Sequence, residues 1–222
     1  MTVDASLSKK SRAVLAGLQL PGESEFEHKS SMDELERLVK TLGFDTVARV
    51  SQKRKYPAAG TIFGKGKLKE LAHYTGGSGY VNGYVKDSST EDDELDAWVD
   101  AQFCKLDELA DNEKATIVIL DCELTPTQLS NLEEATGVEV LDRSGVILEI
   151  FSRHAKSREA RLQVEIAKLA YTAPRLRASR VGSDRQGGGI GSKGAGESSH
   201  ELDKRRVRDR IAELRGQLKS IQ

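Results

Sequence analysis

The sequence predicts an α/β fold: a small, mostly parallel sheet with flanking helices, followed by an antiparallel two-helix arm. Three observations predict it. Short apolar runs alternate with helical patterns over residues 31–151, as in sheets whose parallel strands are joined by helices. Residues 116–120 (TIVIL) are apolar without a break, which is typical of a strand buried on both faces. From residue 152 onward the apolar positions take helical spacing among many Arg and Lys.

Local signals predict the elements of the first part in order. Residues 1–30 are polar and contain Pro21-Gly22, so we expect a flexible lead-in there. Ser31 and Glu34 have capping-box spacing, which predicts a helix from Ser31 that ends at Gly43. The next predicted elements are a strand at 46–50 and a strand at 61–63 that turns into a helix ending near Tyr74. A short strand near 80–85 and a helix over 90–109 follow. After these come the strand at 116–120, a helix from Thr125-Pro126 to Gly137 and a strand at 138–141. Residues 146–151 fit either a strand or the start of the next helix.

The arm is predicted over residues 152–222. Apolar residues repeat at helical spacing up to Pro174, and a second helical stripe runs over 201–221. Between them lies the glycine-rich stretch GGGIGSKGAGE, residues 187–197. At ~1.5 Å per residue each helix would reach roughly 30 Å, which places this loop at the tip of the arm. The predicted organisation is therefore a lead-in at 1–30, an α/β subdomain at 31–151 and a basic helical hairpin at 152–222.

Charge is divided unevenly between these parts. Residues 1–151 hold 17 Lys+Arg and 27 Asp+Glu, a net of −10, whereas residues 152–222 hold 17 and 8, a net of +9. A basic segment attached to an acidic body is typical of a protein whose basic part meets a polyanion.

Several kinds of chemistry lack their sequence signals. No GxxxxGK[ST] phosphate loop occurs, and we interpret the DxxG string at 142–145 as chance. The GxGxxG string at 189–194 lies between two helices, whereas a dinucleotide fingerprint needs a preceding strand. The two cysteines and four histidines follow no metal spacing. We therefore expect no catalytic set, no metal and no cofactor.

The first ten residues lack a signal-peptide run and no stretch is apolar enough to span a membrane, so we expect a cytoplasmic protein.

The candidate binding residues are cations on the arm and glycines at its tip. A loop with little side-chain bulk can approach phosphates and ribose closely. The predicted RNA-binding residues are Arg153, Arg158, Arg161, Arg180, Arg185, Gly187, Gly188, Gly189, Gly191, Lys193, Gly194, Gly196, Arg205, Arg206, Arg208 and Arg210. A second candidate is Gly64-Lys65-Gly66-Lys67, where a strand-to-helix turn fits either an anion or nucleotide site or a tight turn with solvated lysines.

Long stretches of the chain resemble the N-terminal region of the HflX family. They are GKGKLKEL at residues 64–71, Leu124-Thr125-Pro126, the continuous run from Asn131 to Tyr171, PRLR, GGIGSKGAGE, and DKRRVRDRIAELRGQL at 203–218. The resemblance implies an α/β subdomain with a two-helix arm that binds the large ribosomal subunit, with the glycine loop directed at the peptidyl-transferase region. It also implies a role in dissociating and rescuing stalled ribosomes after stress.

The sequence departs from the family in two places. The GTPase domain that usually follows is absent, so we expect either a complete chain without that domain or a piece of a longer protein. At the tip, Ser192, Lys193 and Ala195 stand where the family typically has Thr, Arg and Pro, and Ser198-Ser199-His200 replaces Thr-Gln-Leu. Loss of that proline predicts a less rigid tip.

Three function classes remain open at this point. The preferred hypothesis is a non-enzymatic ribosome-binding factor, active in rescue or hibernation, that contacts rRNA of the large subunit without hydrolysing GTP alone. The alternative is an α/β domain that binds adenine nucleotides or hydrolyses them weakly through residues 64–67. A third hypothesis is self-association through the arm, which the apolar stripe permits.

Overall fold

The structure, a computed structural model, describes residues 11–81, 109–110, 113–175 and 199–221, with the backbone alone for 199–201. The chain divides into two compact units, Met1–Ile147 and Leu148–Gln222. The first is an α/β unit and the second is helical. Helix α5 (Arg143–His154) begins in the first unit and ends in the second. The predicted division stood a few residues later, at 151/152.

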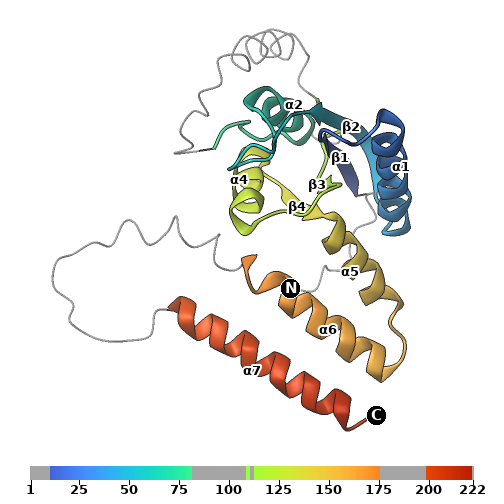
Figure 1. Ribbon diagram of the computed structural model, residues 1–222, viewed down its shortest axis with the longest axis vertical. Coiled ribbons are helices and arrows are strands. Elements are labelled where there is room, and N and C mark those ends of the chain that lie inside the picture. The colour runs from blue at the N-terminus through green and yellow to red at the C-terminus, as the bar shows by residue number, and fades with distance from the viewer. Residues whose placement is uncertain (1–10, 82–108, 111–112, 176–198, 222) are drawn as a thin grey trace, which may run out of the picture. The chain divides into compact units, whose positions relative to one another are not determined.

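The first unit is built on a four-stranded parallel sheet with the strand order β2-β1-β3-β4. The strands are β1 (Arg12–Gln19), β2 (Asp45–Lys53), β3 (Ile117–Leu120) and β4 (Glu139–Asp142). Helices α2 (Lys65–Thr75) and α4 (Pro126–Thr136) cover one face, and α1 (Glu25–Thr41) covers the other (Figure 1). The predicted α/β class, with its mostly parallel sheet and flanking helices, is confirmed.

Strand β1 corrects the prediction for the N-terminal segment. The expected lead-in at residues 1–30 is wrong over 12–19, which form a central strand paired with both β2 and β3. Ala13 to Ala16 have no solvent exposure. The physical reason is that this apolar run, bounded by Pro21-Gly22, has neighbouring strands on both sides and helices on both faces.

Helix α1 also begins earlier than predicted. Its N-cap is Ser24, whose hydroxyl accepts from the Glu27 N–H while the Glu27 carboxylate accepts from the Ser24 N–H, a complete capping box. The predicted cap, Ser31, lies inside the helix. Of the two S-x-x-E signals, at 24–27 and 31–34, the first forms the cap because it directly follows the turn that leaves β1.

Two further expectations meet the structure between β2 and α5. Residues 61–63 do not form a strand: Ala58 and Ile62 exchange backbone hydrogen bonds, and Ile62 has a φ of 67°, which turns the chain instead of extending it. Residues 146–151 are helical, within α5. The helix after Thr125-Pro126 is confirmed as α4, with its capping box and a left-handed Gly137 at its end.

The helical unit contains α6 (Arg158–Thr172) and α7 (Ser199–Lys219), which run antiparallel side by side (Figure 1). This confirms the predicted two-helix arm, although its first helix is shorter than expected because Ser157 caps α6 anew after α5 ends. Leu162 and Leu214 are its buried apolar side chains among the described residues. The predicted strand near 80–85 and helix over 90–109 lie outside the described residues, except for 80, 81 and 109.

Candidate nucleic-acid interface

Helix α7 presents a row of cations to one side of its packing stripe. Leu214, 1% exposed, marks the side that packs on α6. Residues three or four apart lie on the same face of a helix. Arg205, Arg208, Arg215 and Lys219 follow that spacing, with Ala212 between them, and all four cations are exposed. We call these four residues the α7 row.

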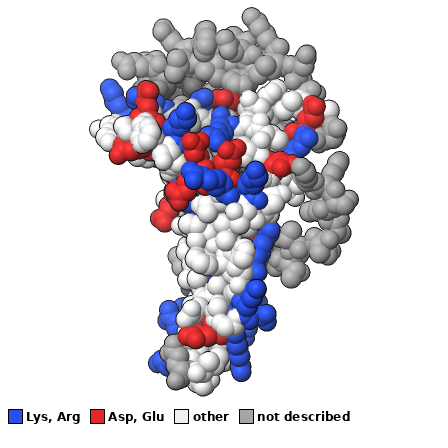
Figure 2. Space-filling model, turned by 90° about the vertical axis from the view of Figure 1, so that its right-hand side faces the viewer, with Lys and Arg blue, Asp and Glu red and all other residues white. Residues whose placement is uncertain are grey.

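The α7 row lies outside the seam between α6 and α7, and its four side chains are exposed to solvent. In Figure 2, Lys and Arg side chains line the right-hand edge of the helical unit and also gather on its left near the lower end, with an acidic patch between them. Asp209 and Glu213 lie on the flank of α7 beside the row. From Arg205 to Lys219 the row covers fifteen residues, or about 21 Å between its ends at the rise of an α-helix, which is long enough to follow several phosphates of a nucleic-acid backbone.

The predicted RNA-binding residues separate into groups. Arg153, Arg158 and Arg161 are exposed near the start of α6 and before it. Arg153 lies 3.5 Å from Glu149, and the Arg161 Nε donates to the Ala155 carbonyl. Residues 176–198 are not described, so the tip residues and their flanking arginines stay predictions: Arg180, Arg185, Gly187, Gly188, Gly189, Gly191, Lys193, Gly194 and Gly196.

Arg210 has a different place from the other predicted cations of α7. Its guanidinium donates to the Glu165 carboxylate of α6 at 2.7 Å and to Glu213 at 3.0 Å. These hydrogen bonds raise the Arg210 pKa further above its usual value. Arg210 therefore joins the two helices, whereas Arg205 and Arg208 stand on the outer face. Sequence reasoning omitted Arg215 and Lys219, although the apolar stripe of α7 indicates which face they occupy.

The Gly64–Lys67 turn forms the start of α2, as expected, although residues 61–63 before it form a turn and not the predicted strand. The Gly64 N–H, one of the groups that would bind an anion, donates to the Gln52 side-chain oxygen at 3.0 Å. Lys67 pairs with Glu70 in the next turn, and Gly66 is buried. Lys65 is the exposed cation of this turn. Two of the groups that could bind an anion at this turn, the Gly64 N–H and the Lys67 ammonium, are therefore already engaged by Gln52 and Glu70.

The Asp142–Gly145 string, which resembles a GTPase motif in letters alone, has a structural role here. Asp142 is 1% exposed, and its carboxylate accepts from the Gly145 N–H at 2.8 Å and from the Leu124 N–H at 3.4 Å. These bonds cap α5 and fix the segment that follows β3. The motif thus begins a helix and leaves no carboxylate free for a nucleotide.

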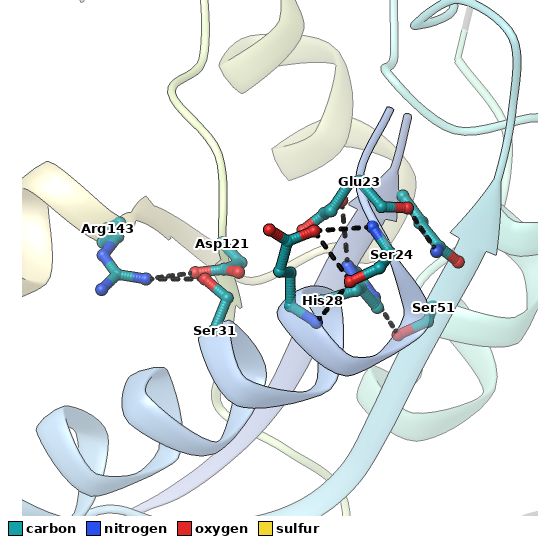
Figure 3. A network of polar contacts seen from close by, with 9 residues as sticks. Glu23, Ser24, His28, Ser31, Ser51, Asp121 and Arg143 are labelled. Carbon is teal, nitrogen blue, oxygen red and sulfur yellow. Dashed lines mark hydrogen bonds and ion pairs between the residues drawn. The ribbon is translucent and has the colours of Figure 1, made fainter. Parts of the chain in front are cut away.

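A polar network at the carboxyl ends of β1 and β3 was not predicted (Figure 3). Arg143 donates to Asp121 at 2.8 Å and to the Ser31 hydroxyl at 3.0 Å, and it also pairs with Glu34. The hydrogen bond to Glu34, together with that to Asp121, raises the Arg143 pKa despite partial burial. No local signal marks the network, because its members come from α1, β3 and α5.

A second part of this network is centred on His28. Its Nε2 lies 3.1 Å from the Ser51 hydroxyl and its Nδ1 3.5 Å from Glu23 (Figure 3). The ring packs on Gly17, where a Cβ would come within 2.8 Å of it. These contacts hold α1 on β1 and β2, and they give the imidazole a positioning role.

Within the described ranges, no group of three His, Cys, Asp or Glu side chains is placed to hold a metal ion, and no helix there has the length and apolarity to cross a bilayer.

Comparison with known proteins defines the class of protein to which this architecture belongs. The family model described as "GTP-binding GTPase N-terminal" matches residues 29–83 and 99–152, and "GTP-binding GTPase Middle Region" matches 154–222. A crystal structure of a GTP-binding protein from Sulfolobus solfataricus in complex with GDP has a TM-score of 0.55 and 21% identity, over 95% of this chain and 45% of that one. That likeness extends to the fold.

Curated relatives place the chain more narrowly. "GTPase HflX" from Gluconacetobacter diazotrophicus is 48% identical over 211 residues, which cover 95% of this chain and 46% of that protein. The protein of the same name from Alkalihalophilus pseudofirmus is 36% identical over 208 residues, or 94% and 41% of the two chains. The chain therefore belongs to the HflX family, of which it represents the N-terminal and middle regions. It spans less than half the length of these relatives.

Proposed function

We propose that this protein is a ribosome-associated factor that binds rRNA of the large subunit near the peptidyl-transferase region and has no GTPase activity of its own. The α7 row is the observation that supports this most directly. Four exposed cations on one helix face present a line of positive charge to a polyanion, and release of condensed counterions drives such binding. The ribosomal context is what the resemblance to the HflX family implies.

The matched regions support the second half of the proposal. Both family models describe regions named N-terminal and middle, and "GTPase" is the name of relatives more than twice as long. A factor that does not turn over GTP would leave the ribosome only by dissociation. That property suits protection or hibernation of stressed ribosomes better than repeated splitting.

The adenine-nucleotide hypothesis receives less support. Gln52 already accepts from the Gly64 N–H, which is one of the groups that an anion at the start of α2 would use. Calorimetric titration with ATP tests this directly; binding of ATP that is lost in Gly64→Ala would favour the nucleotide hypothesis over ours.

Salt-dependent co-sedimentation with purified large subunits tests the proposal. The variant Arg205→Gln/Arg208→Gln/Arg215→Gln/Lys219→Gln removes four phosphate contacts, each contributing about 0.7–0.9 to the slope of log K against log salt. The slope should fall by about 3. Between 50 and 200 mM salt the unaltered chain should then lose roughly 60-fold more affinity than the variant.

A matched pair of single variants separates the row from general charge. Arg206 is equally basic but lies on the flank of α7, 3.4 Å from Asp203. Arg208→Gln should weaken binding more than Arg206→Gln does. If the fourfold variant sediments with large subunits like the unaltered chain at both salt concentrations, the α7 row does not bind rRNA.

A further inference from the structure

One segment of the α/β unit is positive although the unit as a whole is acidic. Residues 1–151 have a net charge of −10, yet residues 46–69 contain no Asp or Glu. Seven cations lie in this stretch: Arg49, Lys53, Arg54, Lys55, Lys65, Lys67 and Lys69. Local charge of this sign in an acidic domain concentrates the positive potential at one place.

The fold brings the two ends of this segment together. The hydrogen bond from the Gly64 N–H to Gln52 joins the start of α2 to the carboxyl end of β2. Lys53 directly follows Gln52, and Lys65 directly follows Gly64. Lys55 lies two residues beyond the strand, and all three lysines are exposed. Lys53 and Lys65, twelve residues apart in the sequence, are thus brought to the same end of one strand.

The remaining cations of the segment have partners within the protein. Arg49 is paired with Asp33 and Glu36 of α1, and the hydrogen bond to Arg49 holds the Asp33 pKa below its usual value. Lys67 pairs with Glu70. In the part of the chain that the structure describes, the exposed end has one acidic contact, that of Lys53 with Glu25 at 4.0 Å, and both side chains are largely in water. An ion pair of this kind contributes little and yields readily to a phosphate.

An exposed aromatic side chain is adjacent in sequence to one of these lysines. Tyr56 directly follows Lys55 and is 79% exposed. A single exposed aromatic needs no explanation by itself. A ring beside a group of cations is, however, the arrangement with which proteins hold single-stranded nucleic acid, since the ring stacks on a base while the cations follow the backbone.

We propose that the carboxyl end of β2 and the turn before α2 form a second RNA-binding surface, which takes an unpaired strand. Lys53, Lys55 and Lys65 contact phosphates, and Tyr56 stacks on a base. These side chains are exposed, and the Gly64 N–H, one of the groups that would bind a terminal phosphate, is bonded to Gln52, so a strand is favoured over a free nucleotide. This surface belongs to the α/β unit and does not depend on the α7 row.

Fluorescence anisotropy with a labelled oligouridine RNA tests this surface on the full chain. Tyr56→Ala should weaken binding about 5- to 150-fold, the range for loss of one stacked base, whereas Tyr56→Phe should stay close to the unaltered chain. Lys55→Gln/Lys65→Gln should lower the salt slope by about 1.4, from two contacts at ~0.7 each for a single strand. The matched control is Arg37→Gln/Lys40→Gln, which removes two exposed charges near the other end of α1 and should leave the slope unchanged.

The same measurements in the background of the fourfold α7-row variant separate the two surfaces. The effects of Tyr56→Ala and of the two lysine changes should persist there. Unchanged affinity in Tyr56→Ala, or equal effects of the two double variants, would overturn the proposal. An equal loss of binding to poly-glutamate would also overturn it, since the surface would then be a general polyanion or acidic-protein site. Neither result bears on large-subunit binding by the α7 row.

Discussion

We expect substitution of Gly77 to cause a large loss in the free energy of unfolding. A Cβ on Gly77 would lie 2.3 Å from the Thr136 carbonyl carbon and 2.4 Å from the carbonyl oxygens of Ala135 and Thr136. These are backbone atoms at the end of α4, which cannot rotate away. Two hydrogen bonds hold the same segment there: the Gly79 N–H donates to Ala135 at 2.8 Å, and the Thr75 hydroxyl donates to Thr136 at 2.7 Å.

The cost of Gly77→Ala follows from this geometry. Cβ contacts essentially never fall below 3.0 Å, so the segment must retreat by at least the difference from 2.3 Å. That movement weakens both hydrogen bonds, at about 1 kcal/mol each, and adds about 1–3 kcal/mol of overpacking strain. We expect a loss of about 3–5 kcal/mol in the free energy of unfolding. At ~2–4 °C per kcal/mol for a chain of this size, Tm should fall by about 6–20 °C.

Urea unfolding followed by far-ultraviolet circular dichroism measures this loss. Gly43→Ala is the control, because Gly43 has a φ of 87° but nothing within 4 Å of its Cβ position. It should cost only the left-handed strain of an alanine, about 1–2 kcal/mol. If Gly77→Ala costs no more than Gly43→Ala, the close packing of residues 75–79 on α4 is refuted.

Three further predictions concern a thiol, a helix cap and the arm. Burial raises the Cys122 pKa to about 12, so in a Cys104→Ser background its thiolate fraction at pH 8 should be roughly 1000-fold below that of an ordinary cysteine; rapid iodoacetamide labelling would contradict this. The Ser24 N–H and hydroxyl lower the Glu27 pKa from its usual 4.5, so the carboxylate stabilises the fold above that value and its contribution disappears as pH falls through the lower folded pKa. Glu27→Gln should therefore destabilise at pH 7 and match the unaltered chain at strongly acid pH, as measured by thermal melts. Leu214→Ala should destabilise the hairpin by at least about 2 kcal/mol and expose α7 to limited proteolysis, whereas uncut α7 would show that the seam does not depend on Leu214.

Elements with complete local signals could be predicted from the sequence. Helix α4 has its proline, its capping box and Gly137 within a few residues, and β3 is a continuous apolar run. Strand β1 was missed because it contains small residues with weak strand preference. The reason for one of them, Gly17, is tertiary: a Cβ there would lie 2.7 Å from the Met32 sulfur and 2.8 Å from the His28 ring. Only the packed position of α1 reveals that requirement.

The candidate interface, too, could be predicted only as far as local sequence signals reach. Its location on the basic C-terminal part followed from net charge alone. Which cations face outward depends on the side of α7 that packs on α6, and the stripe of Val207, Ile211, Leu214 and Leu218 already indicates that side. The pairing of Arg210 with Glu165, forty-five residues apart in the sequence, could not be read from any local pattern.

The like charges of the α7 row lower the stability of the helix, which makes the row informative about function. Arg205 and Arg208 are three residues apart, and Arg215 and Lys219 are four apart; like charges at these spacings destabilise a helix by a few tenths of a kcal/mol per pair. The arm has little reserve to offset this, since Leu162 and Leu214 are the buried apolar side chains in the described part of the unit. A row that served stability would alternate its charges, as Arg210 and Glu213 do on the flank. Lys219 in the last turn of α7 contributes a small favourable term of the opposite sign, so the fourfold variant should differ in stability from the unaltered chain by no more than about 1 kcal/mol while it binds RNA less well. Loss of stability together with binding would mean that the row supports the fold, and the case for an RNA-binding arm would lose its strongest observation.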